Sequence, residues 1–162
     1  MPMPDGAISL TVNGNIVSVR ADGGVSLLSV LRGELGLRGV RFGCGAESCG
    51  ACMVLFDGAP VTSCTLPLER AAGRAVTTPE GLGTKDAPDP LQTAFLAEQA
   101  AQCGYCLGGI LIAAKALLGR NPDPTRAEIA TALEKNLCRC GAHNRMIRAI
   151  ARAGRVLRGE AG

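Results

Sequence analysis

Eight cysteines are the residues of this chain whose type and spacing could do chemistry. They fall into two groups of four: Cys44, Cys49, Cys52 and Cys64, then Cys103, Cys106, Cys138 and Cys140. Four thiolates complete the ligand set of a closed zinc site or of an iron-sulfur cluster. Two four-thiolate metal sites would therefore use every cysteine of the chain.

The first group carries the more specific signal. Cys44, Cys49 and Cys52 follow the C-x4-C-x2-C pattern, which is the spacing of plant-type 2Fe-2S ferredoxins. Glycine or alanine stands at positions 43, 45, 46, 50 and 51, where bulky side chains would block close approach to a cluster and some turns need positive φ. The alternatives are a structural zinc site, which usually has two closely spaced cysteine pairs, and a loop of buried free thiols.

The second group is less diagnostic by spacing alone. Its pairs, Cys103-x2-Cys106 and Cys138-x-Cys140, could hold zinc, an iron-sulfur cluster or a redox-active disulfide. The chain has one histidine, which removes two-histidine Rieske ligation and Cys₂His₂ zinc sites. A metal held here by this chain alone must therefore have only thiolate ligands.

Composition excludes several other functions. We expect a soluble, cytoplasmic protein, because no apolar run is long enough to span a bilayer and residues 1–10 lack a basic segment followed by an apolar one. Cytoplasmic thiols stay reduced, so a disulfide framework is not expected. With one Tyr, three Phe, no Trp and a net charge of +3, we expect no nucleic-acid binding.

The first cysteine group must be positioned by a small α+β unit. Residues 8–12 and 16–20 alternate apolar and polar side chains about Asn13-Gly14, which predicts a β-hairpin with a type I′ turn. Ser26 is the expected N-cap of a helix over residues 27–35, ahead of the cysteine loop. Residues 53–64 predict two short strands about Gly58, and residues 74–78 a last strand.

The second cysteine group must be positioned by helices. The Pro-, Gly- and Asp-rich stretch 79–90 reads as a linker. We expect helices over residues 90–100, 108–119 and 126–136 and a fourth after Cys140, with Asp89 as an N-cap and Thr125 with Glu128 as a capping box. On the last helix Ile147, Ile150, Gly154 and Leu157 share one face, and Arg145, Arg148, Arg152 and Arg155 share another. The predicted domains are residues 1–80 and 81–162.

Three segments carry a family resemblance. "GVRFGCGAESCGACMV", "EQAAQCGYCLGGILIAAKALL" and "NLCRCGAHNRMIRAI" resemble the iron-sulfur subunits of the molybdenum hydroxylases, the xanthine dehydrogenase and aldehyde oxidoreductase family, and especially the small subunits of nicotinate dehydrogenase and isoquinoline 1-oxidoreductase. The resemblance covers essentially the whole chain. It implies a β-grasp 2Fe-2S ferredoxin-like domain followed by an all-α four-helix-bundle domain. Each domain would hold one 2Fe-2S cluster, and the eight cysteines would be the ligands of the two clusters.

The same resemblance implies a role in electron transfer. A large partner subunit would hold molybdopterin cytosine dinucleotide and hydroxylate an N-heterocycle or an aldehyde, while this chain conducts electrons to an acceptor such as a FAD-binding medium subunit or a cytochrome c. It also implies that Gln102 and Cys140 contact the pterin cofactor, with the helical cluster nearer to molybdenum. No catalytic residue is expected on this chain.

Two departures from the family pattern affect residues near the ligands. This chain has Leu107-Gly108 where many members have Ser/Thr-Pro, and Gly141-Ala142-His143 where many have Thr-Gly-Tyr. His143 could tune the inner cluster or simply cap a helix. A free-standing two-cluster ferredoxin and a zinc-binding interaction module remain as alternative functions.

Overall fold

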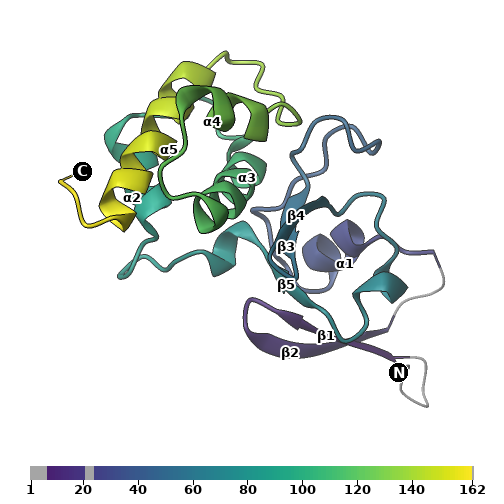
Figure 1. The fold of residues 1–162 in the computed structure, drawn as a ribbon. Helices are drawn as coiled ribbons and strands as arrows, with labels where there is room; N and C mark the ends of the chain where they lie inside the picture. Colours follow the sequence, from purple (N-terminus) through teal and green to yellow (C-terminus); the bar gives the residue numbers. More distant parts are fainter. Residues whose placement is uncertain (1–6, 21–23, 162) are drawn as a thin grey trace.

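The structure is a computed structural model that describes residues 7–20 and 24–161. Its strands are β1 (Ala7–Val12), β2 (Asn15–Arg20), β3 (Met53–Phe56), β4 (Ala59–Thr62) and β5 (Ala75–Thr77). Its α-helices are α1 (Leu27–Gly33), α2 (Pro90–Ala97), α3 (Leu107–Arg120), α4 (Arg126–Ala132) and α5 (His143–Leu157). All strands and α1 lie on one side of the molecule and α2 to α5 on the other (Figure 1), so the predicted α+β organisation is confirmed.

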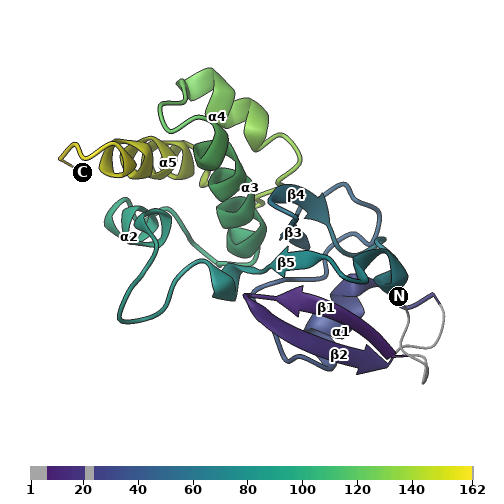
Figure 2. The same ribbon diagram turned by 60° about the horizontal axis from the view of Figure 1, so that its bottom comes forward.

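The first unit is a mixed sheet covered by α1. The strand order is β2-β1-β5-β3-β4, with β1 parallel to β5 and the other neighbouring pairs antiparallel. The β1–β2 turn has φ values of 50° at Asn13 and 82° at Gly14, as the type I′ prediction requires. Ser26 accepts a hydrogen bond from the Ser29 amide at the start of α1. Figure 2 shows α1 lying across the sheet, which is the β-grasp arrangement.

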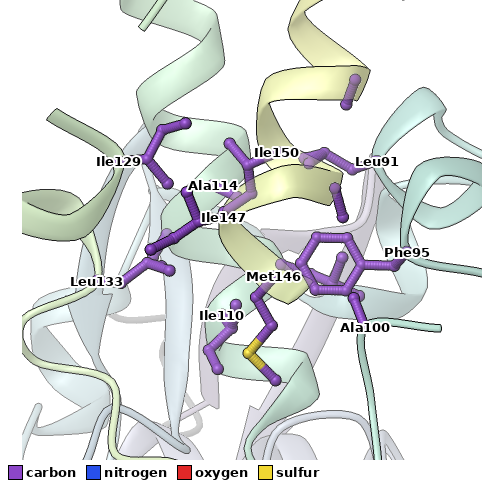
Figure 3. Close-up of a cluster of buried hydrophobic side chains, with 14 of the residues drawn as sticks. Leu91, Phe95, Ala100, Ile110, Ala114, Ile129, Leu133, Met146, Ile147 and Ile150 are labelled. Atoms are coloured by element: carbon purple, nitrogen blue, oxygen red, sulfur yellow. The ribbon is translucent and has the colours of Figure 1, made fainter. Parts of the chain in front are cut away.

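The second unit is a bundle of α2 to α5. Asp89 is the N-cap of α2, and Thr125 begins α4 with a capping box, both as predicted. Gln92 completes a capping box at Asp89 as well, which was not predicted. The core of the bundle draws side chains from each of these elements, including Leu91 and Phe95, Ile110, Ile129, and Met146 and Ile150 (Figure 3). The cysteine pairs of the second group lie in the α2–α3 and α4–α5 connections, so this core fixes the ends of the helices that flank them.

Three details of the bundle differ from the sequence expectation or extend it. Helix α4 ends at Ala132 rather than near residue 136, because the Asn136 amide donates to the Leu133 carbonyl in a tight turn toward Cys138. The sequence pattern puts Leu157 on the buried face of α5, but it is 46% exposed because it is the last residue of that helix. The arginine face is partly used within the chain: Arg148 and Arg152 both pair with Glu98 at the end of α2.

The two units have separate cores that meet at β3. Within the described residues, buried apolar side chains form one cluster around Leu10, Leu27 and Val54 and another around the helices. Met53 of β3 belongs to the helical cluster, so the two units are packed together rather than merely tethered. None of the helices in residues 7–20 and 24–161 is long and apolar enough to cross a membrane.

Candidate metal centres

The first cysteine group is gathered by the loop between α1 and β3 and by the end of β4. Cys44, Cys49 and Cys52 lie on that loop, and Cys64 follows β4 by two residues. Cys44 is exposed, Cys49 and Cys64 are half-buried, and Cys52 is buried. The site therefore spans from the surface of the unit to its core.

Backbone amides point at the outermost sulfur of this group. The amides of Ala46 and Ser48 each donate to Cys44 Sγ at 3.3 Å. These hydrogen bonds lower the pKa of the Cys44 thiol to about 7, because they favour the thiolate. Burial, followed by the neighbouring Cys64 thiol, raises the pKa of Cys52 to about 11. A positive metal centre beside Cys52 would reverse that preference, since a coordinating thiol is deprotonated.

Small residues are required where this loop passes the sulfurs. A Cβ atom at Gly43 would lie 2.5 Å from Cys49 Sγ, closer than real contacts allow. Gly50 has a φ of 70° and would collide with Asn136 if it carried a side chain. The sequence argument for small residues is confirmed at these two positions, although at Gly50 the crowding comes from the helical unit rather than from the loop itself.

Glu47 and Thr65 close this loop and were not identified from the sequence. Glu47 has a φ of 58°, which is uncommon for a residue with a long side chain. Its carboxylate accepts a hydrogen bond from the Thr65 hydroxyl, and Thr65 directly follows Cys64. No sequence pattern indicates this contact, because it depends on the folded course of the loop.

The second cysteine group is gathered by two connections of the helical bundle. Cys103 and Cys106 lie between α2 and α3, and Cys138 and Cys140 between α4 and α5. The Tyr105 amide and the Cys140 thiol lower the pKa of Cys103. Burial and the adjacent Cys138 raise the pKa of Cys106 to about 12. The pKa of Cys138 is lowered although burial opposes the shift, because the Ala142 amide and the Cys106 thiol hydrogen-bond to its sulfur.

Within each group the thiols affect one another in pairs. Cys49 contributes to the lowered pKa of Cys44, and Cys64 contributes to the raised pKa of Cys52. Cys140 contributes to the lowered pKa of Cys103, and Cys138 contributes to the raised pKa of Cys106. In the part of the chain that the structure describes, no three His, Cys, Asp or Glu side chains are grouped to hold a single metal ion. Two thiolates for each of two irons is the donor arrangement of an all-cysteine 2Fe-2S cluster, so the residues present fit that group.

The structure also brings the two groups to one place. A cavity of about 450 Å³ is lined by Cys44 and Cys49 of the first group and by Cys103, Cys106 and Cys138 of the second. Gln102 is exposed and shares a narrow crevice with Cys103, Cys106, Cys138 and Cys140. The crevice thus places Gln102 and Cys140 together.

Two further side chains lie beside the cysteines. The Tyr105 hydroxyl donates to the carbonyl oxygen of Phe42, and the guanidinium carbon of Arg41 lies 5.2 Å from the centre of the Tyr105 ring. Tyr105 of the second unit therefore contacts Arg41 and Phe42 of the first, while its side chain stays partly exposed. His143 Nε2 lies 2.9 Å from the Asn136 carbonyl oxygen, so it bonds the cysteine loop rather than only capping α5.

Comparison with known proteins identifies the family. Residues 10–77 match the 2Fe-2S iron-sulfur cluster binding domain family and residues 78–151 match a second 2Fe-2S binding domain family. A nicotinate dehydrogenase subunit of Pseudomonas putida is 52% identical over 93% of this chain and 96% of its own length. The alpha subunit of isoquinoline 1-oxidoreductase from Brevundimonas diminuta is 45% identical over 91% of this chain and 97% of its own length.

Solved structures agree with the sequence comparison. The aldehyde oxidoreductase of Desulfovibrio desulfuricans superimposes with a TM-score of 0.92 and 39% identity over 95% of this chain, which corresponds to 17% of that longer protein. Both 2Fe-2S domains therefore occur in the predicted order, and a zinc-binding module is not supported. The chain belongs to the iron-sulfur subunits of the molybdenum hydroxylase family and is an electron-transfer component, with two 2Fe-2S binding domains, of an oxidoreductase complex.

Proposed function

We propose that the two cysteine groups hold one 2Fe-2S cluster each. Cys44, Cys49, Cys52 and Cys64 are the ligands in the first unit, and Cys103, Cys106, Cys138 and Cys140 are the ligands in the second. The observation that carries this proposal is that each complete cysteine group lies within its own match to a 2Fe-2S binding domain family, and that all four cysteines of the second group line one crevice. We place the boundary between the two units near residue 80, which agrees with their separate hydrophobic cores.

The bound clusters would accept and release one electron at a time. The chain would set their reduction potentials through hydrogen bonds to the ligand sulfurs and through solvent exposure. The amides of Ala46 and Ser48 favour negative charge on Cys44, and hydrogen bonds to ligand sulfurs are among the groups that set cluster potentials. Each group has one exposed, two half-buried and one buried cysteine. Solvent exposure is a second determinant of potential, and each proposed centre would lie between the surface and the core of its unit.

The partner in this proposal is a large subunit that holds molybdopterin cytosine dinucleotide. Gln102 is exposed at the entrance to the second group, where its amide can donate to and accept from a polar cofactor edge. Cys140 lies in the same crevice. The helical unit would then face the cofactor, and the ferredoxin-like unit would face the electron acceptor, a FAD-binding medium subunit or a cytochrome c.

The substrate class follows from the relatives rather than from this chain. The proteins similar to it over nearly their whole length are named for nicotinate and isoquinoline, both aromatic N-heterocycles. We propose that the complex hydroxylates a compound of this class, with an aldehyde as the second candidate, and that it works in the cytoplasm. The residues that select the substrate would belong to the large subunit.

Two variants separate conduction from cofactor contact in the assembled complex. Cys52→Ala removes a ligand of the first group, and Gln102→Ala removes the proposed cofactor contact. After anaerobic rapid mixing with substrate, we expect Cys52→Ala to keep its molybdenum content and its first reduction, while steady-state turnover collapses. We expect Gln102→Ala to slow the first reduction or to lower the cofactor content.

The opposite result for Cys52→Ala would overturn the proposal. If the assembled variant kept its cofactor but lost the first reduction by substrate, this chain would take a direct part in substrate oxidation. Unchanged turnover would equally contradict an electron path through the first group.

A further inference from the structure

The two units are joined at the cysteine loops by backbone-to-backbone contact. The Leu137 amide donates to the Cys49 carbonyl oxygen at 3.0 Å, and Asn136 Nδ2 lies 3.4 Å from the Gly50 carbonyl oxygen. On the opposite side of the loop, a Cβ atom on Gly109 of α3 would overlap that same oxygen. The Cys49–Gly50 segment is therefore held between the start of α3 and the turn that leads to Cys138.

His143 supports this turn from the side of α5. Its Nε2 atom lies 2.9 Å from the Asn136 carbonyl oxygen. A carbonyl oxygen can only accept, so Nε2 is the protonated nitrogen and donates this bond. His143 is the first residue of a 15-residue helix, which gives the donor a fixed position. Asn136 is thus bonded to α5 through His143. Asn136 and Leu137 are both bonded to the first unit, at Gly50 and Cys49.

Asn136 is a costly residue to bury at this position. It is 3% exposed, and its Oδ1 atom has no hydrogen-bond partner among the described residues. An unpartnered buried acceptor destabilises the folded state, because it gives up its hydrogen bonds to water without replacing them. Turning the amide over would place Oδ1 against the Gly50 carbonyl oxygen, so the observed orientation keeps the donor where it joins the two loops.

We propose that His143 and Asn136 are positioning residues that hold the loop bearing Cys138 and Cys140 against the loop bearing Cys49, and so set the spacing between the two metal centres. Neither residue is a ligand. The inference rests on the proposed function, because the spacing matters only if both cysteine groups hold clusters. The contacts are consecutive along the chain. His143 bonds the Asn136 carbonyl oxygen, the amide of the following Leu137 bonds the Cys49 carbonyl oxygen, and Cys138 comes directly after Leu137.

Two amide substitutions at position 143 test the proposal in the assembled, iron-loaded complex. In His143→Gln the side-chain amide nitrogen can reach the place of Nε2 and keep the bond, whereas in His143→Asn it is one methylene too short. Glu134→Ala is the matched control, since Glu134 is exposed on the same turn and the structure gives its carboxylate no hydrogen bond or ion pair with a described residue.

Three readouts follow each variant: the magnetic splitting between the two reduced centres by EPR, their reduction potentials, and the hydrogen exchange of the Leu137 amide. For His143→Asn we expect a smaller splitting, a shifted potential of the second centre and severalfold faster exchange at Leu137. His143→Gln and Glu134→Ala should match the wild type in all three readouts. A merely local helix-capping role would leave the splitting and the potential unchanged.

Failure of this inference can be told from failure of the proposed function. If the wild-type complex shows both iron signals and His143→Asn leaves the splitting, the potential and Leu137 exchange unchanged, the positioning role is wrong. If the wild type itself lacks two iron-sulfur signals, the proposed function fails, and with it any role in spacing. Equal changes in His143→Gln and His143→Asn would also overturn the proposal. They would show that a side-chain nitrogen able to reach the Asn136 carbonyl oxygen makes no difference.

Discussion

The sulfur of Cys49 occupies the space that a side chain at Gly43 would need, with 2.5 Å between Sγ and an added Cβ atom. This relationship explains a small residue one position before the first ligand. It also makes the loop between α1 and β3 sensitive to a single methyl group, because the neighbouring atom is a proposed metal ligand rather than the end of a flexible side chain.

Gly43→Ala should therefore displace the Cys49 sulfur. We expect the variant to lose or broaden the EPR signal of the first centre and to retain that of the second. Gly33→Ala is the control, since nothing lies within 4 Å of a Cβ atom at that position. Equal spectra for the two alanine variants would show that the loop tolerates the methyl group and that Cys49 is not constrained as described.

The two centres should fail independently when their ligands are replaced. Cys49→Ser should damage the first centre and Cys106→Ser the second, because the residues belong to units with separate hydrophobic cores. Iron content and EPR spectra of each variant would check this. Loss of both signals from either single substitution would indicate one cooperative site instead of two.

Local sequence signals predicted most of the elements that carry the cysteines. Asn13-Gly14, Ser26, Asp89 and Thr125 each specify a turn or a helix start through contacts within a few residues, and the structure has them all. The C-x4-C-x2-C pattern of Cys44, Cys49 and Cys52 is likewise local, and the structure places these three cysteines on one loop.

Contacts between distant segments could not be predicted in this way. The meeting of Cys103 and Cys106 with Cys138 and Cys140 around one crevice depends on how α3 and α4 return the chain to the α2–α3 turn. The close approach of Gly50 to Asn136 depends on the packing of the two units. Neither of these two contacts can be predicted from the spacing of the residues in the sequence.

Asp89 should be important for stability rather than for electron transfer. Its buried carboxylate pairs with Lys115 of α3 and accepts a hydrogen bond from the Leu91 amide at the start of α2. Asp89→Ala removes a helix cap and leaves a partly buried ammonium without its partner, so we expect a loss of about 2–4 kcal/mol in the free energy of unfolding. Denaturant unfolding would measure it.

The control for Asp89 is the exposed pair of Arg74 with Asp57. Arg74→Ala should change the free energy of unfolding by less than about 1 kcal/mol. Similar losses for Asp89→Ala and Arg74→Ala would contradict the difference in burial that the prediction uses.

The contact between Glu98 and α5 should make a pH-dependent contribution. Hydrogen bonds from Arg148, and then from Arg152, lower the pKa of the Glu98 carboxyl. A lowered folded-state pKa adds stability that is present above the carboxyl's ordinary range and is lost as the pH falls through the folded value. The melting temperature of Glu98→Gln should thus lie slightly below that of the wild type at pH 7, and the gap should close in acid.

High salt provides a second check on Glu98. Because the Glu98 carboxylate is half-buried and still open to solvent, about 1 M salt should partly narrow the difference in melting temperature between wild type and Glu98→Gln at pH 7. A gap that is independent of both pH and salt would mean that Glu98 acts through packing instead of charge.

The metal content of the full chain tests the central claim most directly. If the eight cysteines hold two all-thiolate 2Fe-2S clusters, the purified brown protein should contain about four irons and about four acid-labile sulfides per chain, without stoichiometric zinc. Its reduced form should give two distinct EPR signals. About two irons with one zinc per chain, or a colourless zinc protein, would contradict the assignment of both cysteine groups to iron-sulfur clusters.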